Sequence, residues 1–154
     1  MKTLKQHIDE ALKIGKNLFE WSSYSCQPKT KDELKKIIED RISKEGPECD
    51  LNDIDVSLVT DMSYLFYESK FTGDISEWDV SKVKNMTGMF YCTPSFNCDI
   101  STWNINNVNS MWSMFDRSNF NQNISNWEID TNCDIRDMFH NCLIKDEFIP
   151  KSLH

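Results

Sequence analysis

The chain has 154 residues, of which 39% are hydrophobic and 12% aromatic, and its formal net charge is −8. This length and composition are typical of one globular domain, or of a repeat array with a cap, that can bury its own core. The charge is uneven: residues 1–48 carry ten Lys/Arg and nine Asp/Glu, whereas residues 49–154 carry seven and sixteen. The acidic second part should repel phosphate backbones, which argues against direct nucleic-acid binding.

The N-terminal residues 1–16 carry charged side chains every few positions and therefore lack the apolar core of a secretory signal. No stretch is long and apolar enough to span a membrane. These features predict a cytoplasmic protein without membrane contact, with the extracellular space or a virion surface as the alternative. In the cytoplasm the six cysteines would be reduced thiols. Cys49 and Cys98 occupy equivalent positions two units apart, which should place them beyond disulfide reach.

Residues 1–48 predict an N-terminal helical cap. In residues 3–20 apolar side chains recur at helical intervals between charged ones. A second helix should begin after Thr30, which can accept a backbone hydrogen bond as N-cap while Glu33 reaches back, and it should end at Gly46. Together the two helices are expected to cover the open end of the first repeat unit, whose core would otherwise be exposed.

Residues 49–144 contain four copies of one pattern, and residues 145–154 form a C-terminal tail or cap. Matched apolar residues such as Leu51, Ile75 and Ile100 are 24 or 25 positions apart. A period between about 20 and 50 residues is typical of proteins in which each unit buries its apolar face against its neighbours. The four copies are CDLNDIDVSLVTDMSYLF, GDISEWDVSKVKNMTGMF, CDISTWNINNVNSMWSMF and QNISNWEIDTNCDIRDMF.

Each unit predicts a strand followed by a short helix. Alternate apolar residues, such as Trp103 and Ile105, would share one side of an extended strand. Apolar residues then follow at spacings of three and four, as in Met111, Met114 and Phe115, which fits one or two helical turns packed on the strands. The predicted fold class is therefore α/β, with four rungs of strand plus short helix stacked behind an N-terminal helical cap.

The run F-x-G/x-D-I-S-x-W-D/N-V followed by M-x-x-M-F, best seen in residues 71–90 and 96–115, resembles the BspA-type leucine-rich-repeat family. That family occurs in many bacterial surface proteins and in mycoplasmas. The resemblance covers residues 47–144 and implies a leucine-rich-repeat solenoid used for protein binding and adhesion, without a catalytic site. The chain departs from the family in two ways. Many members carry export signals that are not evident here. In the fourth unit, Asn132 stands at the position that valine occupies in the other three units. A small intracellular adaptor fits these departures better than a surface adhesin.

The candidate binding surface is a polar strip on the outer side of the predicted strands. Its acidic and amide side chains recur in successive units, and we expect the strip to dock a basic protein surface by complementary charge. A solvated face kept polar for solubility is the alternative. Trp112 is a further candidate, as an exposed anchor, because it replaces Ser63 and Thr87 of earlier units and Trp is enriched in binding hot spots. The strip consists of Asp53, Asp55, Glu77, Asp79, Asn104, Asn126 and Glu128.

Two further sets of equivalent residues are expected to be structural. A polar ladder could offer oxygen ligands to a divalent cation, but short polar side chains at turns usually bind nearby backbone N–H groups. A tryptophan ladder could form a platform for sugars or bases, but Ile54 replaces it in the first unit, which favours a core position. The polar ladder is Asp50, Asp74, Asp99 and Asn123, and the tryptophans are Trp78, Trp103 and Trp127.

No motif indicates catalysis, a cofactor or a metal centre. The sequence lacks G-x-S-x-G, H-E-x-x-H and a phosphate-binding glycine loop. The set of His140, Cys142 and Cys133 matches no standard zinc spacing. We therefore expect a non-enzymatic, intracellular module that binds a protein partner, with a basic surface favoured. The alternatives are a structural or adhesion protein of a cell surface or virion, and an acidic nucleic-acid mimic that inhibits a DNA-binding target in an anti-defence role.

Overall fold

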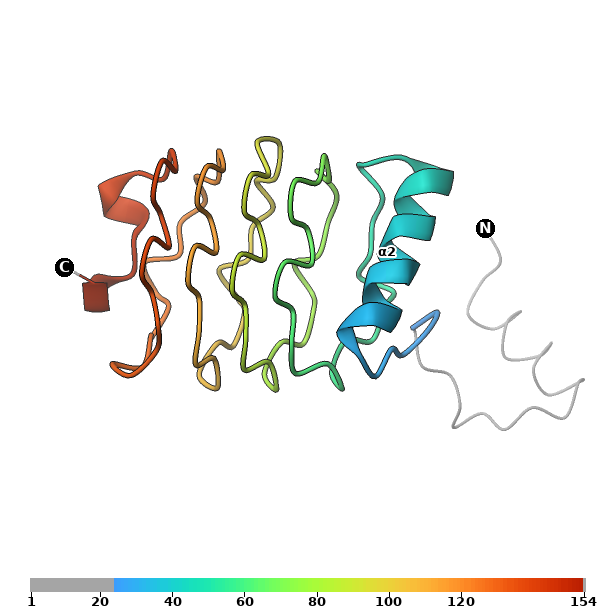
Figure 1. The fold of residues 1–154 in the computed structure, drawn as a ribbon, viewed down its shortest axis with the longest axis horizontal. Coiled ribbons are helices and arrows are strands. Elements are labelled where there is room, and N and C mark those ends of the chain that lie inside the picture. Colours follow the sequence, from blue (N-terminus) through green and yellow to red (C-terminus); the bar gives the residue numbers. More distant parts are fainter. Residues whose placement is uncertain (1–23, 154) are drawn as a thin grey trace, which may run out of the picture.

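The computed structural model of the chain describes residues 24–153. Within this range, coils of chain stack side by side, one for each repeat unit (Figure 1). Helix α2 (Lys31–Glu45) lies at one end of the stack, and two short 3-10 helices, η2 (Asp146–Phe148) and η3 (Lys151–Leu153), lie at the other. The helix predicted over residues 3–20 lies outside the described residues. Across residues 24–153, no helix combines the length and the hydropathy that a membrane-spanning segment needs.

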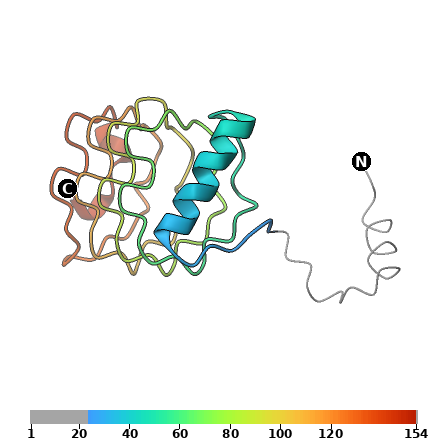
Figure 2. The same ribbon diagram turned by 45° about the vertical axis from the view of Figure 1, so that its right-hand side comes forward.

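Helix α2 confirms the second helix of the predicted cap. The Thr30 side chain accepts a hydrogen bond from the backbone N–H of Glu33 at 3.2 Å, and the Glu33 carboxylate accepts one from the N–H four residues earlier at 2.8 Å. Gly46 ends the helix with a φ of 95°, a conformation that residues with a Cβ rarely adopt. Leu34 and Ile38 are buried in the same core as the repeats, so α2 covers the first unit (Figure 2).

The predicted α/β leucine-rich-repeat solenoid is wrong. Residues 24–153 contain no β-strand, and α2 is the one α-helix among them. Aspartates at positions 50, 55 and 61 of the first unit each accept a hydrogen bond from the backbone N–H two residues later, which turns the chain. Because these turns are so closely spaced, the extended runs are too short for ladders. Single-residue parallel bridges take their place: Cys26↔Ile54, Asp50↔Asp74, Asp61↔Asn85, Asn85↔Ser110 and Ser110↔Asp134.

The short helices predicted in each unit are successive turns instead. The N–H of Leu65 binds the carbonyl of Met62, and the N–H of Tyr67 binds that of Tyr64, both at 3.3 Å. Tyr64 and Glu68 lie in the left-handed region with φ values of 55° and 53°, and equivalent residues of the other units do the same. A left-handed residue interrupts an α-helix. The apolar spacings of three and four thus arise from turns that point their side chains inward.

Hydrogen bonds between neighbouring units run in one direction along this stretch. Backbone N–H groups of one unit donate to carbonyls of the next at 2.8–3.0 Å in the first pair of units. The second and third units repeat the arrangement towards their successors. The first pairs are Met62 to Asn85, Tyr64 to Thr87, Phe66 to Met89 and Glu68 to Tyr91. Beside this stretch, bonds such as Lys84 to Thr60 at 2.8 Å and Asn109 to Lys84 at 2.7 Å run in the opposite direction, so neighbouring units exchange donors and acceptors.

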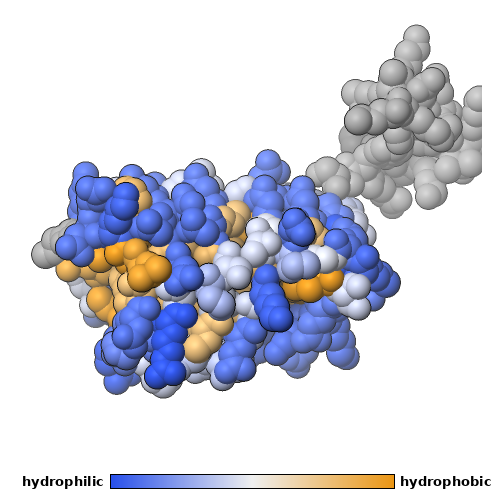
Figure 3. Space-filling model, turned by 90° about the horizontal axis from the view of Figure 1, so that it is seen from above, coloured by the Kyte–Doolittle hydropathy of each residue, from blue (hydrophilic) through white to orange (hydrophobic). Residues whose placement is uncertain are grey.

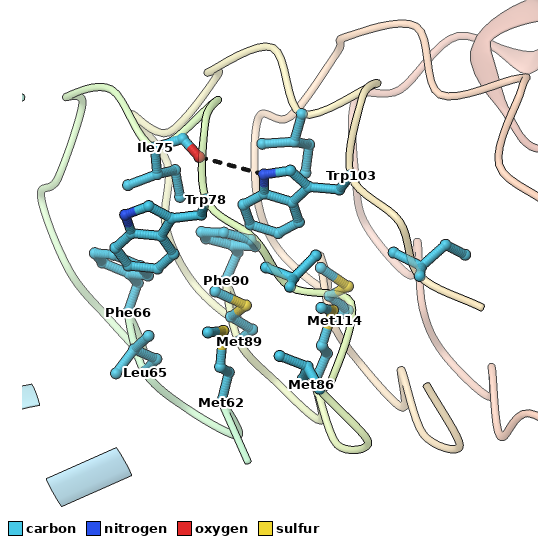
Figure 4. Close-up of a cluster of buried hydrophobic side chains, with 14 of the residues drawn as sticks. Met62, Leu65, Phe66, Ile75, Trp78, Met86, Met89, Phe90, Trp103 and Met114 are labelled. Carbon is cyan, nitrogen blue, oxygen red and sulfur yellow. Dashed lines mark hydrogen bonds between the residues drawn. The ribbon is translucent and has the colours of Figure 1, made fainter. Parts of the chain in front are cut away.

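The core consists of columns in which equivalent side chains of successive units lie together (Figure 4). Trp78, Trp103 and Trp127 are at most 4% exposed, which confirms the tryptophan ladder as core. Each indole N–H donates to a backbone carbonyl of the preceding unit, for example from Trp103 to Ile75 at 3.2 Å (Figure 4). These bonds satisfy the polar atom of a large buried side chain and fix the register of neighbouring units.

Two columns of phenylalanine rings pack beside the tryptophans. In the first column the ring centroids of Phe90 lie 5.5 Å from Phe66 and 5.6 Å from Phe115. The second column stacks against the first, with 4.0 Å between Phe90 and Phe96 and 4.3 Å between Phe115 and Phe120. The second column lies next to the polar connections between units and adds a buried layer to the core predicted from the sequence.

Candidate functional site

The polar ladder at the start of each unit has the turn role that the sequence favours. Asp74 Oδ1 accepts a hydrogen bond from the N–H of Ser76 at 2.8 Å, and Asp99 Oδ1 accepts one from Ser101 at 3.0 Å. These backbone hydrogen bonds hold the pKa of both carboxyl groups below the usual range. Each carboxylate therefore shapes its own turn. Among residues 24–153 no group of three His, Cys, Asp or Glu side chains is placed to hold a metal ion.

The first unit of the predicted acidic strip is held by the N-terminal segment. Arg41 of α2 forms an ion pair with Asp53 at 3.0 Å, and the Gln27 side chain donates to Asp55 at 2.5 Å. Burial raises the pKa of Asp55, but hydrogen bonds from Ser57 and Gln27 outweigh it and hold the pKa below the usual range. Asp53 and Asp55 thus attach the cap to the first unit and are less available to a partner.

The other strip residues are exposed, but several have structural bonds. Asp79 and Asn104 each accept a hydrogen bond from the backbone N–H two residues later, at 3.0 and 3.2 Å. The Asn126 side chain donates to the Ser101 carbonyl at 3.0 Å. Glu77 and Glu128 have no side-chain hydrogen bond within residues 24–153. The strip as a binding surface stays a prediction, with exposed carboxylates at Glu77, Asp79 and Glu128.

Trp112 lies in a different place, a groove of about 450 Å³ that the sequence did not predict. Its side chain is 42% exposed, and Tyr64 and Tyr67 beside the groove are exposed to a similar degree. Aromatic rings thus meet carboxyl groups and a histidine in one concave surface. The lining residues are Tyr64, Tyr67, Tyr91, Trp112, Ser113, Asp116, Asp137 and His140.

The repeat builds this groove from two rows of equivalent positions. One row consists of the left-handed residues, among which Gly88 is the only glycine. The Tyr64 ring lies over Gly88 so closely that a Cβ there would overlap it. Backbone bonds within each unit, such as Tyr91 to Gly88 at 3.1 Å, hold the two rows side by side, and bonds between units, such as Gly88 to Trp112 at 2.8 Å, place Trp112 next to them. The first row is Tyr64, Gly88, Ser113 and Asp137, and the second is Tyr67, Tyr91, Asp116 and His140.

The N-terminal half of the groove is aromatic. Tyr64 meets Tyr67 edge-on with 5.9 Å between ring centroids, and Tyr67 stacks on Tyr91 at 5.5 Å. The Tyr67 hydroxyl donates to Glu68 at 2.8 Å, and this hydrogen bond raises the pKa of the tyrosine. These contacts hold three rings in fixed orientations, so little side-chain freedom would be lost when a partner docks.

The C-terminal half of the groove is acidic. The Asp116 side chain is 9% exposed, and its Oδ1 lies 3.1 Å from Nδ1 of His140. Towards an ionised Asp116 carboxylate, which only accepts hydrogen bonds, Nδ1 donates in the tautomer that carries its proton there. The other oxygen, Oδ2, has no hydrogen-bond partner within residues 24–153. Asp137 adds an exposed carboxyl group nearby. His140 therefore orients Asp116 and is not grouped with Cys142 and Cys133 as a metal ligand.

Sequence reasoning placed Trp112 in a binding site but missed its acidic neighbours. Ser113, Asp116, Asp137 and His140 occupy repeat positions that hold tyrosine or glycine in earlier units. This change from aromatic to polar along equivalent positions was a usable signal. Its meaning became clear only when the structure showed that these positions line one groove.

Hydrophobic side chains also gather elsewhere. Figure 3 shows them in a strip between hydrophilic margins, broadest towards the C-terminal end. Leu143, at 65%, is the most exposed large hydrophobic residue of the described chain. Single apolar residues on a surface are normal in folded proteins. The aromatic groove, which combines rings with carboxyl groups, is therefore the stronger candidate.

The Cys98 thiol should be nearly unreactive at pH 8. Burial raises its pKa to about 11, and the thiol also donates to Asp74 at 3.4 Å. Only the thiolate is nucleophilic, so a thiol with this pKa should be alkylated about 100-fold more slowly than a free cysteine, whose pKa is about 8.5. Peptide mapping after timed iodoacetamide treatment of the folded protein measures this rate. The alkylation rate should rise steadily up to pH 11. A rate at pH 8 equal to that of a cysteine peptide would contradict the raised pKa.

The stacked units and the groove at their equivalent positions define a repeat protein. Residues 33–150 match the family described as "Mycoplasma protein of unknown function, DUF285", and the chain belongs to this family. The finer assignment to BspA-type leucine-rich repeats stays a prediction. No curated protein and no solved structure matches the chain.

Proposed function

We propose that the protein is a non-enzymatic binding module that docks a protein partner through the aromatic groove. The observation that carries this proposal is the gathering of exposed aromatic side chains, Tyr64, Tyr67 and Trp112, in one concave surface. Trp and Tyr dominate the binding energy of many protein interfaces because they bury a large area with little loss of side-chain entropy. Rigid surroundings add to this advantage, since preorganised surfaces have less to order on binding.

Electrostatics favour a partner with a basic surface. The repeat part of the chain carries sixteen Asp/Glu against seven Lys/Arg, and no Lys or Arg lines the groove. Opposite charge on the partner would increase the association rate and fix its orientation. The resemblance of the repeat motif to BspA-type repeats, which serve in protein binding and adhesion, supports the same class of function. The exposed Glu77 and Glu128 of the strip would contribute mainly to steering.

Affinity capture from a lysate of the native cell tests this proposal. We expect one stoichiometric protein to be retained by the unchanged chain and lost with the double variant Trp112→Ala/Tyr67→Ala. Truncating hot-spot aromatics typically costs at least about 2 kcal/mol of binding free energy, or about 30-fold in affinity. Leu58→Ala is the matched control, because Leu58 is an exposed large hydrophobic residue outside the groove.

A second variant separates the two candidate surfaces. If Glu77→Lys/Glu128→Lys abolished capture and the aromatic variant did not, the strip would be the docking surface. If neither variant changed the set of captured proteins, the module would not use these faces. A structural or adhesion role would then be the better proposal. Competition between DNA and the protein for a captured DNA-binding partner would favour the mimic instead.

A further inference from the structure

We propose that the acidic half of the groove is a subsite for one arginine side chain of the partner. This inference rests on the proposed protein-binding function and names the group that the groove receives. Asp116 carries the argument: its side chain is nine-tenths buried, yet Oδ2 has no hydrogen-bond partner within residues 24–153. A largely buried carboxylate that lines a groove and has one oxygen without a protein donor can accept charge-assisted hydrogen bonds from a cationic ligand.

No cationic side chain of the neighbouring residues neutralises the Oδ2 oxygen of Asp116, so a partner's cation could bind there. His140 occupies only Oδ1, through a single hydrogen bond of 3.1 Å. The nearby Arg136 does not compete, because it forms two hydrogen bonds with Asp134 at 2.9 and 2.7 Å. Asp137 places a second carboxyl group in the same groove. The subsite therefore has two acidic side chains and no Lys or Arg in its lining.

The aromatic half selects a guanidinium group among possible cations. A guanidinium is planar, stacks on aromatic faces and carries five N–H donors in its plane. It can lie against the Trp112 or tyrosine rings while its N–H groups reach Asp116 and Asp137. Cation–π attraction and the charge-assisted hydrogen bonds then act on the same group. The compact ammonium of lysine offers a point charge without this planar match.

Amide-resolved NMR titration of the full chain with acetyl-arginine amide tests the subsite without a protein partner. The indole N–H signal of Trp112 should shift with added arginine and saturate. Acetyl-citrulline amide, which has the same shape but no charge, should cause no saturable shift. Equal shifts with both compounds would overturn the proposal, because the site would then recognise shape rather than charge.

Asp116→Asn keeps the size of the side chain and removes its charge, and it should weaken arginine binding about tenfold. Glu128→Gln removes one charge outside the groove and should leave the affinity unchanged. Because Asp116 is buried, its variant must first show a folded spectrum. Asp137→Asn provides a second variant at an exposed position, with a smaller expected loss. Wild-type affinity in both groove variants would overturn the proposal.

The two proposals fail in distinguishable ways. If the aromatic double variant loses the captured protein but arginine amide does not bind, the groove is a protein-binding site without the arginine subsite. If arginine amide binds as described but capture does not depend on the groove, the subsite stands and the protein-docking function falls.

Discussion

Replacing Trp103 by alanine is expected to lower the free energy of unfolding by about 3–5 kcal/mol. Trp103 is 4% exposed in the middle of the stack, and its ring lies against Phe90 with 6.4 Å between centroids. Its indole also donates to the Ile75 carbonyl of the preceding unit. The substitution therefore leaves a large cavity and removes one hydrogen bond at the junction between two units.

Chemical denaturation with urea, followed by circular dichroism, measures this loss. Trp112→Ala is the matched control, because it makes the same chemical change at a side chain that is 42% exposed. Substitutions at exposed positions usually change stability by no more than about 0.5 kcal/mol. Similar losses for Trp103→Ala and Trp112→Ala would show that the buried column contributes no more than a surface ring.

Phe90→Ala is the second substitution with a large expected effect, again about 3–5 kcal/mol. The Phe90 ring contacts Phe66, Phe96 and Phe115 at centroid distances of 5.5, 4.0 and 5.6 Å. It is fully buried, and it joins both phenylalanine columns across three units. Its removal should therefore weaken the packing of the central unit on both sides.

Phe139→Ala is the comparison for Phe90→Ala. Phe139 ends the same column, stacks on Phe115 alone at 5.8 Å and is only partly buried. We expect a loss well below that of Phe90→Ala, because fewer contacts disappear and solvent already reaches the site. Equal midpoints and slopes in urea for the two variants would contradict the idea that stability concentrates at the centre of the stack.

The repeat, its period and most of its core could be predicted because equivalent residues keep their apolar character. The conformation of the units could not. Spacings of three and four suit an α-helix, and they also suit consecutive turns when every fourth residue is left-handed. Tyr64, Cys92 and Arg117 adopt positive φ values, although none of these residue types favours the left-handed region. The backbone bonds between units stabilise that conformation, and such bonds are not encoded in a local pattern.

For the candidate site, the role of a single unusual residue could be predicted, but contacts between distant residues could not. Trp112 departs from the residues at equivalent positions, so its exposure could be predicted from the repeat. Asp53 and Asp55 look like members of an open strip, but Arg41 and Gln27 from an earlier part of the chain cover them. Only the fold brings Asp116 into one groove with Tyr64, Tyr67 and Tyr91, because those tyrosines belong to earlier units.

The recurring hydrogen bonds between units bear on how such an array could change in length. The junctions between the four units repeat the same backbone bonds at equivalent residues, as in Met62 to Asn85, Met86 to Ser110 and Met111 to Asp134. A whole unit inserted between two others would meet matching groups on both its faces, whereas an insertion of part of a unit would misalign them. We therefore expect the backbone to accommodate duplication or loss of whole units of 24 or 25 residues. The length of the groove can vary in those steps while both ends keep their caps.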